Sequence, residues 1–394
     1  MAFDARTYAW SRLQDGMRLF HAGDRLPAAP LLQQVLDTPN AEAAHCMAAA
    51  GLLAETYRGA CDYLRATQYY ELAISEGQRI SPADQRRNEW YTHYQPRSVL
   101  GLAMVRRRTL DSDRRSIPTL LRDLAAEAPG RFGSDVPAQV QLVAGLYDRQ
   151  MGDLESCCSR LREAIDDLKE QPLPYTFLGP DHAEALLAQS QLLAPESQFS
   201  AGASSEKVLK NPTASAWSRG ISASVQLHLL AAMAFRSDPR SVEQLRERQP
   251  KIRAAQDVLD QCASEDGDAF LRTESCVMDA LWLARAGALS SSRAAFGQLV
   301  SELDALPRAP DALVVLRAME SVAISRAFLD DQGGEAVDSL CERAFALEEG
   351  FSAAAARYGR RHQSLRSAQL DAEAGAAADW FAEPLQSARA LAWP

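Results

Sequence analysis

Apolar residues recur every three or four positions along most of the chain, which is the spacing of one face of an α-helix. Runs of alternating β-branched residues, which would indicate strands, are nearly absent. Residues 142–168, LVAGLYDRQMGDLESCCSRLREAIDDL, show the recurring unit: an amphipathic helix, a Gly-Asp turn and a second amphipathic helix. The pattern therefore predicts an all-α fold built from antiparallel helix pairs.

Small residues recur once in each predicted pair, where two helices must approach each other closely. In residues 47–78, small and aromatic residues hold set positions in both helices: Leu53, Ala54 and Tyr57 in the first, and Ala66, Tyr70 and Ala73 in the second. One small residue from each first helix gives a series of eight markers: Gly16, Ala54, Gly101, Gly145, Ala188, Ala232, Ala280 and Ala323. Successive markers are 38 to 48 residues apart. This near-constant spacing predicts about eight pairs, with longer helices or linkers than in a repeat of about 34 residues.

The turn LGPDH, which begins at Leu178, separates two predicted pairs. Gly179 permits a backbone turn with positive φ, and Pro180 cannot continue a preceding helix. Asp181 is a suitable N-cap, and Glu184 three residues later would complete an arrangement similar to a capping box. The turn is therefore interpreted as the boundary between two helices, with a catalytic or metal-binding role for its aspartate and histidine as the weaker alternative.

The paired helices and the LGPDH turn resemble the tetratricopeptide-repeat family, and in particular kinesin-light-chain-like arrays, whose longer repeats are joined by such a linker. The resemblance is strongest over residues 138–193, fair over 9–78 and limited to the architecture beyond. It implies a right-handed α-solenoid whose concave surface receives peptides or helices of other proteins.

A stretch rich in serine, glycine and alanine divides the predicted array. Residues 1–196 are expected to form an N-terminal half-array, and 197–216 a loop. Residues 217–366 are expected to form divergent C-terminal repeats, and 367–394 helices that cap the last repeat.

Composition narrows the class of function. The formal net charge of −10 favours solubility and argues against nucleic-acid binding. The seven cysteines include no CxxC pair, the start lacks a signal-peptide pattern, and no apolar run is long enough for a membrane span. The common nucleotide, zinc-protease and hydrolase motifs are also absent. We therefore expect a cytoplasmic protein with no membrane span, no cofactor, no metal and no catalytic residue.

Two short motifs suggest chemistry and have a structural alternative. Asp166 and Asp167 begin DDLKE, which resembles the aspartate-rich motif with which all-helical terpene synthases hold magnesium. The second metal motif of those enzymes is missing here, so a solvated helix face is favoured. Cys157 and Cys158 could form a redox pair, but their place in the second helix favours a buried, structural role.

The predicted alignment places a basic residue four or five positions after most markers. These residues are His21, Arg58, Arg106, Arg149, Arg236 and Arg285. On the concave face of a solenoid they would line a groove that favours an acidic protein or peptide. They also lie in the last turn of each predicted helix, where the helix dipole stabilises a cation, so a purely structural role stays open.

A non-enzymatic adaptor or scaffold that binds a protein or peptide is the favoured function. One alternative is a regulatory protein that senses a small molecule or peptide and acts through a partner. A more remote alternative is an all-helical, magnesium-dependent enzyme. No oligomeric state is predicted.

Overall fold

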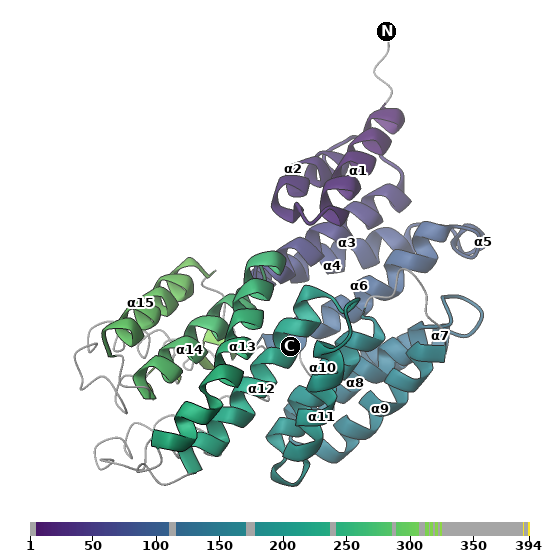
Figure 1. Cartoon of the computed structure of the whole chain (residues 1–394). Coiled ribbons are helices and arrows are strands. Elements are labelled where there is room, and N and C mark those ends of the chain that lie inside the picture. The colour runs from purple at the N-terminus through teal and green to yellow at the C-terminus, as the bar shows by residue number, and fades with distance from the viewer. Residues whose placement is uncertain are drawn as a thin grey trace. The chain divides into compact units, whose positions relative to one another are not determined.

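The computed structural model describes residues 5–109, 116–170, 178–236, 242–285 and 289–306. It also describes a few later positions: 312–314, 316, 317, 320, 321, 324, 389, 393 and 394. Within these residues the chain forms fifteen α-helices and one short 3-10 helix, and no strand (Figure 1). The all-α fold class predicted from the apolar spacing is therefore confirmed.

The chain divides into two compact units. Unit 1 comprises Met1–Thr109, Asp113–Ala144 and Asp166–Leu178, and unit 2 comprises the remainder up to Pro394. Two helices, α8 (Val136–Met151) and α9 (Leu154–Glu170), contribute residues to both units.

Seven helices of unit 1 follow one another along the chain: α1 (Ala5–His21), α2 (Arg25–Leu36), α3 (Ala43–Gly59), α4 (Tyr63–Gln78), α5 (Pro82–Gln85), α6 (Glu89–Arg108) and α7 (Ile117–Glu127). Helices α1, α3 and α6 each pack against the helix that completes their pair, which is α2, α4 or α7. They also pack in series, α1 against α3 and α3 against α6.

Unit 2 repeats this pattern with α10 (Pro180–Leu193), α11 (Gln198–Leu209), α12 (Ala216–Arg236), α13 (Val242–Asp266), α14 (Ala269–Arg285) and α15 (Leu289–Ala305). Each even-numbered helix packs against its successor, and α12 also packs against both α10 and α14. We call α1, α3, α6, α8, α10, α12 and α14 the first helices, and their partners the second helices. The repeated markers predicted contacts between neighbouring helices in pairs, and these contacts agree with that prediction.

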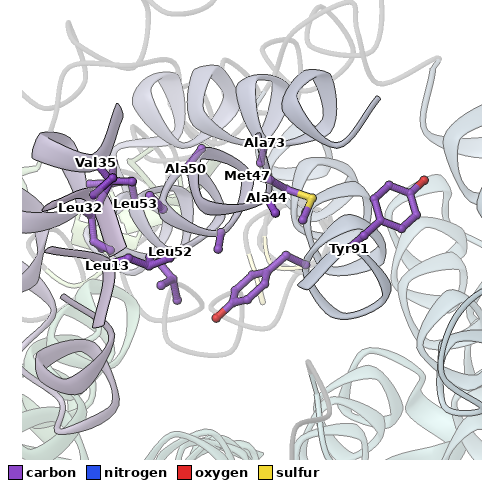
Figure 2. Close-up of a cluster of buried hydrophobic side chains, with 14 of the residues drawn as sticks. Leu13, Leu32, Val35, Ala44, Met47, Ala50, Leu52, Leu53, Ala73 and Tyr91 are labelled. Carbon is purple, nitrogen blue, oxygen red and sulfur yellow. The ribbon is translucent and has the colours of Figure 1, made fainter. Parts of the chain in front are cut away.

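The marker residues lie at close helix crossings. Figure 2 shows the core of unit 1, where Leu13, Leu32 and Leu53 pack between the first two pairs. A Cβ atom on Gly16 would lie 2.8 Å from Cδ2 of Leu32, and one on Gly101 would overlap the Tyr70 ring. Larger residues at these positions would force the helices apart, which explains the small residue there.

Three more markers are alanines with fully buried side chains: Ala54, Ala188 and Ala280. In unit 2, a Cβ on Gly145 of α8 would lie 3.2 Å from the carbonyl oxygen of Cys157 on α9. The side chains of Ala232 and Ala323 lie outside the described residues.

The LGPDH turn begins a helix, but its capping differs from the prediction. Helix α10 starts at Pro180, and the N-cap is Gly179 with φ of −79°, so no positive φ occurs. The Asp181 carboxylate instead accepts a hydrogen bond from the Asn211 side chain at 3.0 Å, and Glu184 pairs with Lys207. The boundary interpretation is confirmed, whereas the predicted Asp181 cap is wrong.

The predicted loop at residues 197–216 is also wrong over most of its length. Its larger part is α11, which follows the 3-10 helix at Pro195–Ser197. Ala201, Ser205 and Val208 form the buried face of α11, and the Ser205 hydroxyl donates to the carbonyl oxygen of Ala201 at 2.9 Å. Small and hydroxyl-bearing residues therefore fill a helix face that the apolar pattern did not reveal.

Only three positions of the predicted capping segment 367–394 are described, and of these Arg389 is helical. The remainder of that segment, and residues 325–366 of the predicted C-terminal repeats, lie outside the described residues. The predicted half-array boundaries stay predictions. Among the described helices, none combines the length and the apolar composition needed to cross a membrane.

Candidate functional site

The six basic residues predicted to line a groove all lie at or near the ends of first helices. His21 ends α1, and Arg58, Arg106 and Arg149 lie in the last turns of α3, α6 and α8. Arg236 and Arg285 end α12 and α14, but their side chains lie outside the described residues. All six residues therefore lie near the end of a helix, and the four whose side chains are described have different surroundings.

Arg58 is held within its own pair of helices. It forms an ion pair with Glu55 of the same helix at 2.6 Å, and Tyr70 of α4 donates its hydroxyl to Glu55 at 2.6 Å. Burial raises the pKa of Glu55, but Arg58 and then Tyr70 outweigh it, so the pKa lies below the ordinary value. Arg58 thus balances a buried carboxylate.

Arg106 of α6 connects its own helix to α4 and to the start of α7. Its guanidinium pairs with Glu71 of α4 at 2.7 Å and donates to the Ser116 hydroxyl, just before α7, at 2.7 Å. The side chain of Arg106 is 15% exposed. Both this arginine and the one in α3 therefore have an acidic partner within the chain.

His21 lies near a second basic group on α6. Arg97 donates to Nε2 of His93 at 2.8 Å, which is possible because the His93 imidazole is neutral. Burial, and after it the nearby Arg97 and His21, lower the pKa of His93 to about 4. This end of unit 1 combines two imidazoles with a permanent positive charge.

Aromatic side chains continue the first-helix face of unit 1 away from these basic groups. Trp10 of α1 packs edge-on against Trp90 of α6, with ring centroids 5.7 Å apart, and lies 5.1 Å from the ring of His45 of α3. Tyr94 stacks on Trp90 at 5.7 Å. Trp10 and Trp90 are only half-buried, so the first helices of unit 1 present an aromatic surface to their surroundings.

Arg149 differs from the other predicted residues because it is fully buried. Nη1 donates to Oγ of Ser190 on α10 at 3.1 Å and lies 3.4 Å from Oε1 of Gln189. Nη2 donates to the backbone oxygens of Trp393 and Pro394, at 2.8 Å in both cases. This arginine therefore binds the main chain of a distant segment of the same protein.

The distant segment is anchored by its side chains as well as by its backbone. Trp393 is fully buried, and its ring centroid lies 5.4 Å from that of His228 on α12. The backbone N–H of Trp393 donates to the carbonyl oxygen of Arg389 at 2.8 Å. The two residues are four positions apart, which is the spacing of one helical turn. The Arg389 guanidinium lies 5.9 Å from the Trp393 ring centroid. We call the described residues Arg389, Trp393 and Pro394 the tail anchor.

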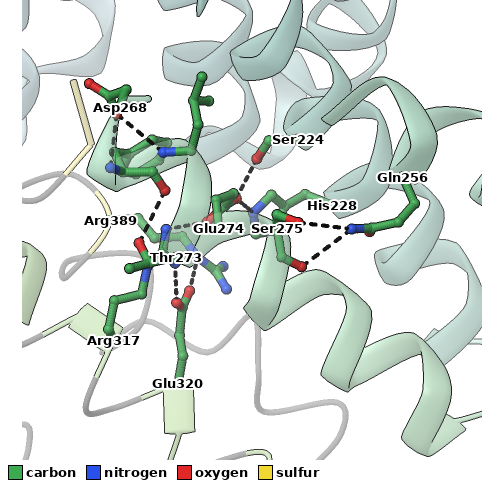
Figure 3. A network of polar contacts seen from close by, with 12 residues as sticks. Ser224, His228, Gln256, Asp268, Thr273, Glu274, Ser275, Arg317, Glu320 and Arg389 are labelled. Atoms are coloured by element: carbon green, nitrogen blue, oxygen red, sulfur yellow. Dashed lines mark hydrogen bonds and ion pairs between the residues drawn. The ribbon is translucent and has the colours of Figure 1, made fainter. Parts of the chain in front are cut away.

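Figure 3 shows the polar network that receives the tail anchor. Glu274 of α14 lies at its centre: it accepts hydrogen bonds from Ser224, from His228 at 2.8 Å, and from Arg317 at 2.5 Å. Arg317 also pairs with Glu320. These charged side chains are all fully buried.

Glu320 connects this network to the tail anchor. Nε of Arg389 lies 3.5 Å from Oε1 of Glu320. Two carboxylates, Glu274 and Glu320, thus face two guanidinium groups, Arg317 and Arg389. Opposite charges in equal number are what buried ions require, because an uncompensated charge in a low-dielectric interior is strongly destabilising.

The protonation states follow from burial and from these neighbours. Burial lowers the pKa of His228 to about 4, although Glu274 opposes the shift, so the imidazole is neutral at pH 7. Burial alone would raise the pKa of Glu274, but Arg317 and then His228 hold it well below its ordinary value. Nε2 of the neutral His228 therefore carries the proton that it donates to the carboxylate.

The two adjacent cysteines lie beside Arg149. Cys157 and Cys158 are both buried, as their place in the second helix predicted. A hydrogen bond from Cys158 and the nearby Arg149 lower the pKa of Cys157 to about 7, although burial opposes them. The same hydrogen bond raises the pKa of Cys158.

Asp166 and Asp167 of the DDLKE motif are exposed on α9. Across the part of the chain that the structure describes, no group of three or more acidic, histidine or cysteine side chains has the geometry to hold a metal ion.

Sequence reasoning missed most of the residues that receive the tail anchor. Four of them share one feature, which is a polar side chain inside a mostly apolar stretch of a first helix: Gln189, Ser190, Ser224 and His228; Glu274 lies instead between Thr273 and Ser275. Polar groups at such positions are buried at a cost unless a partner meets them. The sequence AEALLAQSQLL and the sequence ISASVQLHLLAA therefore carried a signal for a buried polar site.

No family model matches this chain, and no curated protein matches it either.

Proposed function

We propose that the protein is a non-enzymatic adaptor of the tetratricopeptide-like kind, a right-handed α-solenoid of about eight helix pairs. Its first helices form the concave surface and hold a segment of another protein or a peptide. Paired helices packed in series within each unit support this architecture. The LGPDH turn at the start of α10 and the small residues at helix crossings support the same assignment.

One observation carries the proposed activity: the first helices of unit 2, together with Glu320, already hold a segment of the same chain. Arg149 takes two backbone oxygens, His228 packs on an indole, and Glu320 faces an arginine. Backbone recognition together with one aromatic anchor is a general mode of peptide binding. The surface that does this in unit 2 is built from the same kind of helix as the half-buried aromatic surface of unit 1.

The acidic character expected of the partner rests on Arg58 and Arg106. Glu55 and Glu71 already neutralise these two arginines, so they attract an acidic ligand less than isolated cations would. The half-buried Trp10 and Trp90 instead favour a partner segment with an apolar or aromatic side chain. Arg97, which lies close enough to His21 to lower the pKa of that imidazole, adds a permanent positive charge to unit 1.

Site-specific photo-cross-linking in the native cell tests this function. A benzophenone amino acid at position 21 or 90 should form an adduct with one defined protein. Mass spectrometry of the cross-linked peptide identifies that protein. The matched controls are Leu26 on α2 and Leu64 on α4, which are 69% and 62% exposed and belong to second helices. Adducts from the control positions alone, or from none of the four, would overturn the proposal.

A second candidate function is a regulatory protein that senses a peptide and acts through a partner. The occupied site in unit 2 favours it, because a ligand that competes for that site would change what the rest of the chain does. In both cases the site binds a segment of polypeptide and carries out no reaction.

A further inference from the structure

The tail anchor is bound through three separable recognition elements. Arg149 recognises backbone oxygens, which any peptide carries. His228 provides the surface for the Trp393 ring, and Glu320 provides the charge that meets Arg389. The first element sets the position of the main chain, and the other two set the sequence that fits.

The spacing of the two side-chain elements is defined by the helical turn. The hydrogen bond from the Trp393 N–H to the Arg389 carbonyl brings residues four positions apart onto one face. Glu320 therefore selects a basic residue four positions before the aromatic residue that packs on His228. A polypeptide with an acidic or apolar residue at the first position would leave Glu320 without this partner.

The tail anchor is also far from its receptor in sequence. Arg149 precedes Trp393 by 244 positions, so the tail anchor is a ligand that is covalently linked to its own binding site. A tether gives an effective concentration of up to the millimolar range. A separate peptide with the same contacts would have to overcome that advantage, and an untethered tail would remove it.

We infer that this site in unit 2 recognises a helical turn with an arginine four residues before a tryptophan, and that the tail anchor occupies it as an internal competitor of a partner segment with that pattern. The inference rests on the proposed function. It adds the chemistry of the partner, which is basic and aromatic, and the regulation of the site, which is closed until the tail anchor leaves.

Severing the tether of the folded, full-length protein tests this inference. A cleavage site for a specific protease is inserted between Ala377 and Ala378, outside the described residues, and the chain is cut after it has folded. The probe is a fluorescent, C-terminally amidated peptide with the sequence of residues 385–394, LQSARALAWP. We expect the peptide to bind the cut protein at least about tenfold more tightly than the uncut protein, because cutting removes the tether.

Variants of the peptide test the pattern. The peptide with Trp393→Ala should bind about 30-fold more weakly, as for an aromatic hot spot, and the peptide with Arg389→Glu should bind still more weakly because it opposes Glu320. A scrambled peptide of the same composition is the control. Equal binding of the scrambled and native peptides would overturn the inference.

A second variant keeps the test decisive if the cut protein unfolds. Trp393→Ala in the intact chain weakens the tail anchor, and the native peptide should then raise the melting temperature of this variant but not that of the wild type. If the native peptide does not raise the melting temperature of Trp393→Ala, the inference is overturned. It is also overturned if two copies of the chain exchange their tails and added peptide does not bind. These results concern unit 2, whereas cross-linking at positions 21 and 90 reports on unit 1, so the two proposals fail separately.

Discussion

Arg149 donates hydrogen bonds to the backbone oxygens of Trp393 and Pro394 at 2.8 Å, across 244 and 245 positions of sequence. The guanidinium is fully buried, and it also meets Ser190 of the neighbouring first helix. A buried arginine is stable only where acceptors surround it. Arg149, which was predicted to line an open groove, is therefore buried against other segments of the same chain.

Arg149→Gln should destabilise unit 2 by about 2 kcal/mol or more, because it leaves several buried oxygens without a donor. Arg106→Gln is the matched comparison, since the partner of Arg106, Glu71, has a side chain that is 49% exposed. It should cost about 0.2–1 kcal/mol. Urea denaturation followed by circular dichroism measures both variants. Equal losses for the two would contradict the buried role of Arg149.

Trp393→Ala should destabilise unit 2 by roughly 3–5 kcal/mol, because it removes a fully buried indole and leaves a cavity beside His228. Trp393→Phe keeps an aromatic ring in the site and should retain more than half of that stability. The two variants are compared by chemical denaturation at one protein concentration. If alanine and phenylalanine cost the same, ring packing on His228 does not hold the tail anchor.

Gly101→Ala should destabilise unit 1 by about 1–3 kcal/mol through overpacking. The added methyl group would overlap the Tyr70 ring, which cannot swing away easily because its hydroxyl donates to Glu55 at 2.6 Å. Gly297→Ala is the control: Gly297 lies in α15 with nothing near its Cβ position, so alanine should stabilise the helix by about 0.5–1 kcal/mol. A loss at both positions would indicate a general intolerance of alanine instead of a close crossing.

The free energy of unfolding should fall as the pH is lowered from 6.5 towards 4. His228 has its pKa lowered from 6.5 to about 4 in the folded protein, so over this range the unfolded state binds a proton that the folded state does not. The loss is at most about 1.4 kcal/mol per pH unit for this residue, and His93, shifted to about 4 as well, adds to it. The charged groups around His228 are Glu274, Arg317 and Arg389.

His228→Gln should reduce this acid sensitivity, since glutamine does not titrate and can still donate to Glu274. The measurement is the difference in melting temperature between about pH 7.5 and about pH 5. His21→Gln, in unit 1, is the comparison: partial burial and Arg97 also lower the pKa of His21, but its shift is smaller than that of His228, so this variant should remove less of the acid sensitivity. An unchanged pH dependence in His228→Gln would mean that other groups govern the acid transition.

The fold class and the helix crossings could be predicted because they are local in sequence. Apolar spacing reveals helices, and a small residue such as Gly101 or Ala54 recurs where two neighbouring helices touch. The misassigned loop shows the limit of this reasoning. In α11 the buried face contains Ser205, whose hydroxyl donates a hydrogen bond to a carbonyl oxygen of its own helix. A polar residue therefore occupies a buried position that apolar spacing does not reveal.

The candidate site could be predicted only in part. The pattern correctly placed Arg149 in the last turn of a helix, because apolar spacing locates helices. Its burial could not be inferred, since its partners lie 41 positions away at Ser190 and 244 positions away at Trp393. Contacts of that range depend on tertiary packing, which a local pattern of residues does not encode.

The long separation between Arg149 and its acceptors has a consequence for synthesis on the ribosome. At about 5–20 residues per second, translation reaches Pro394 roughly 10–50 s after Arg149 has been added to the nascent chain. His228 and Glu320 are added in turn during that interval, and the Arg149 guanidinium lacks two of its acceptors until residues 393 and 394 follow. Because an uncompensated buried charge is strongly destabilising, we expect unit 2 to reach its full stability only after residues 393 and 394 have been added.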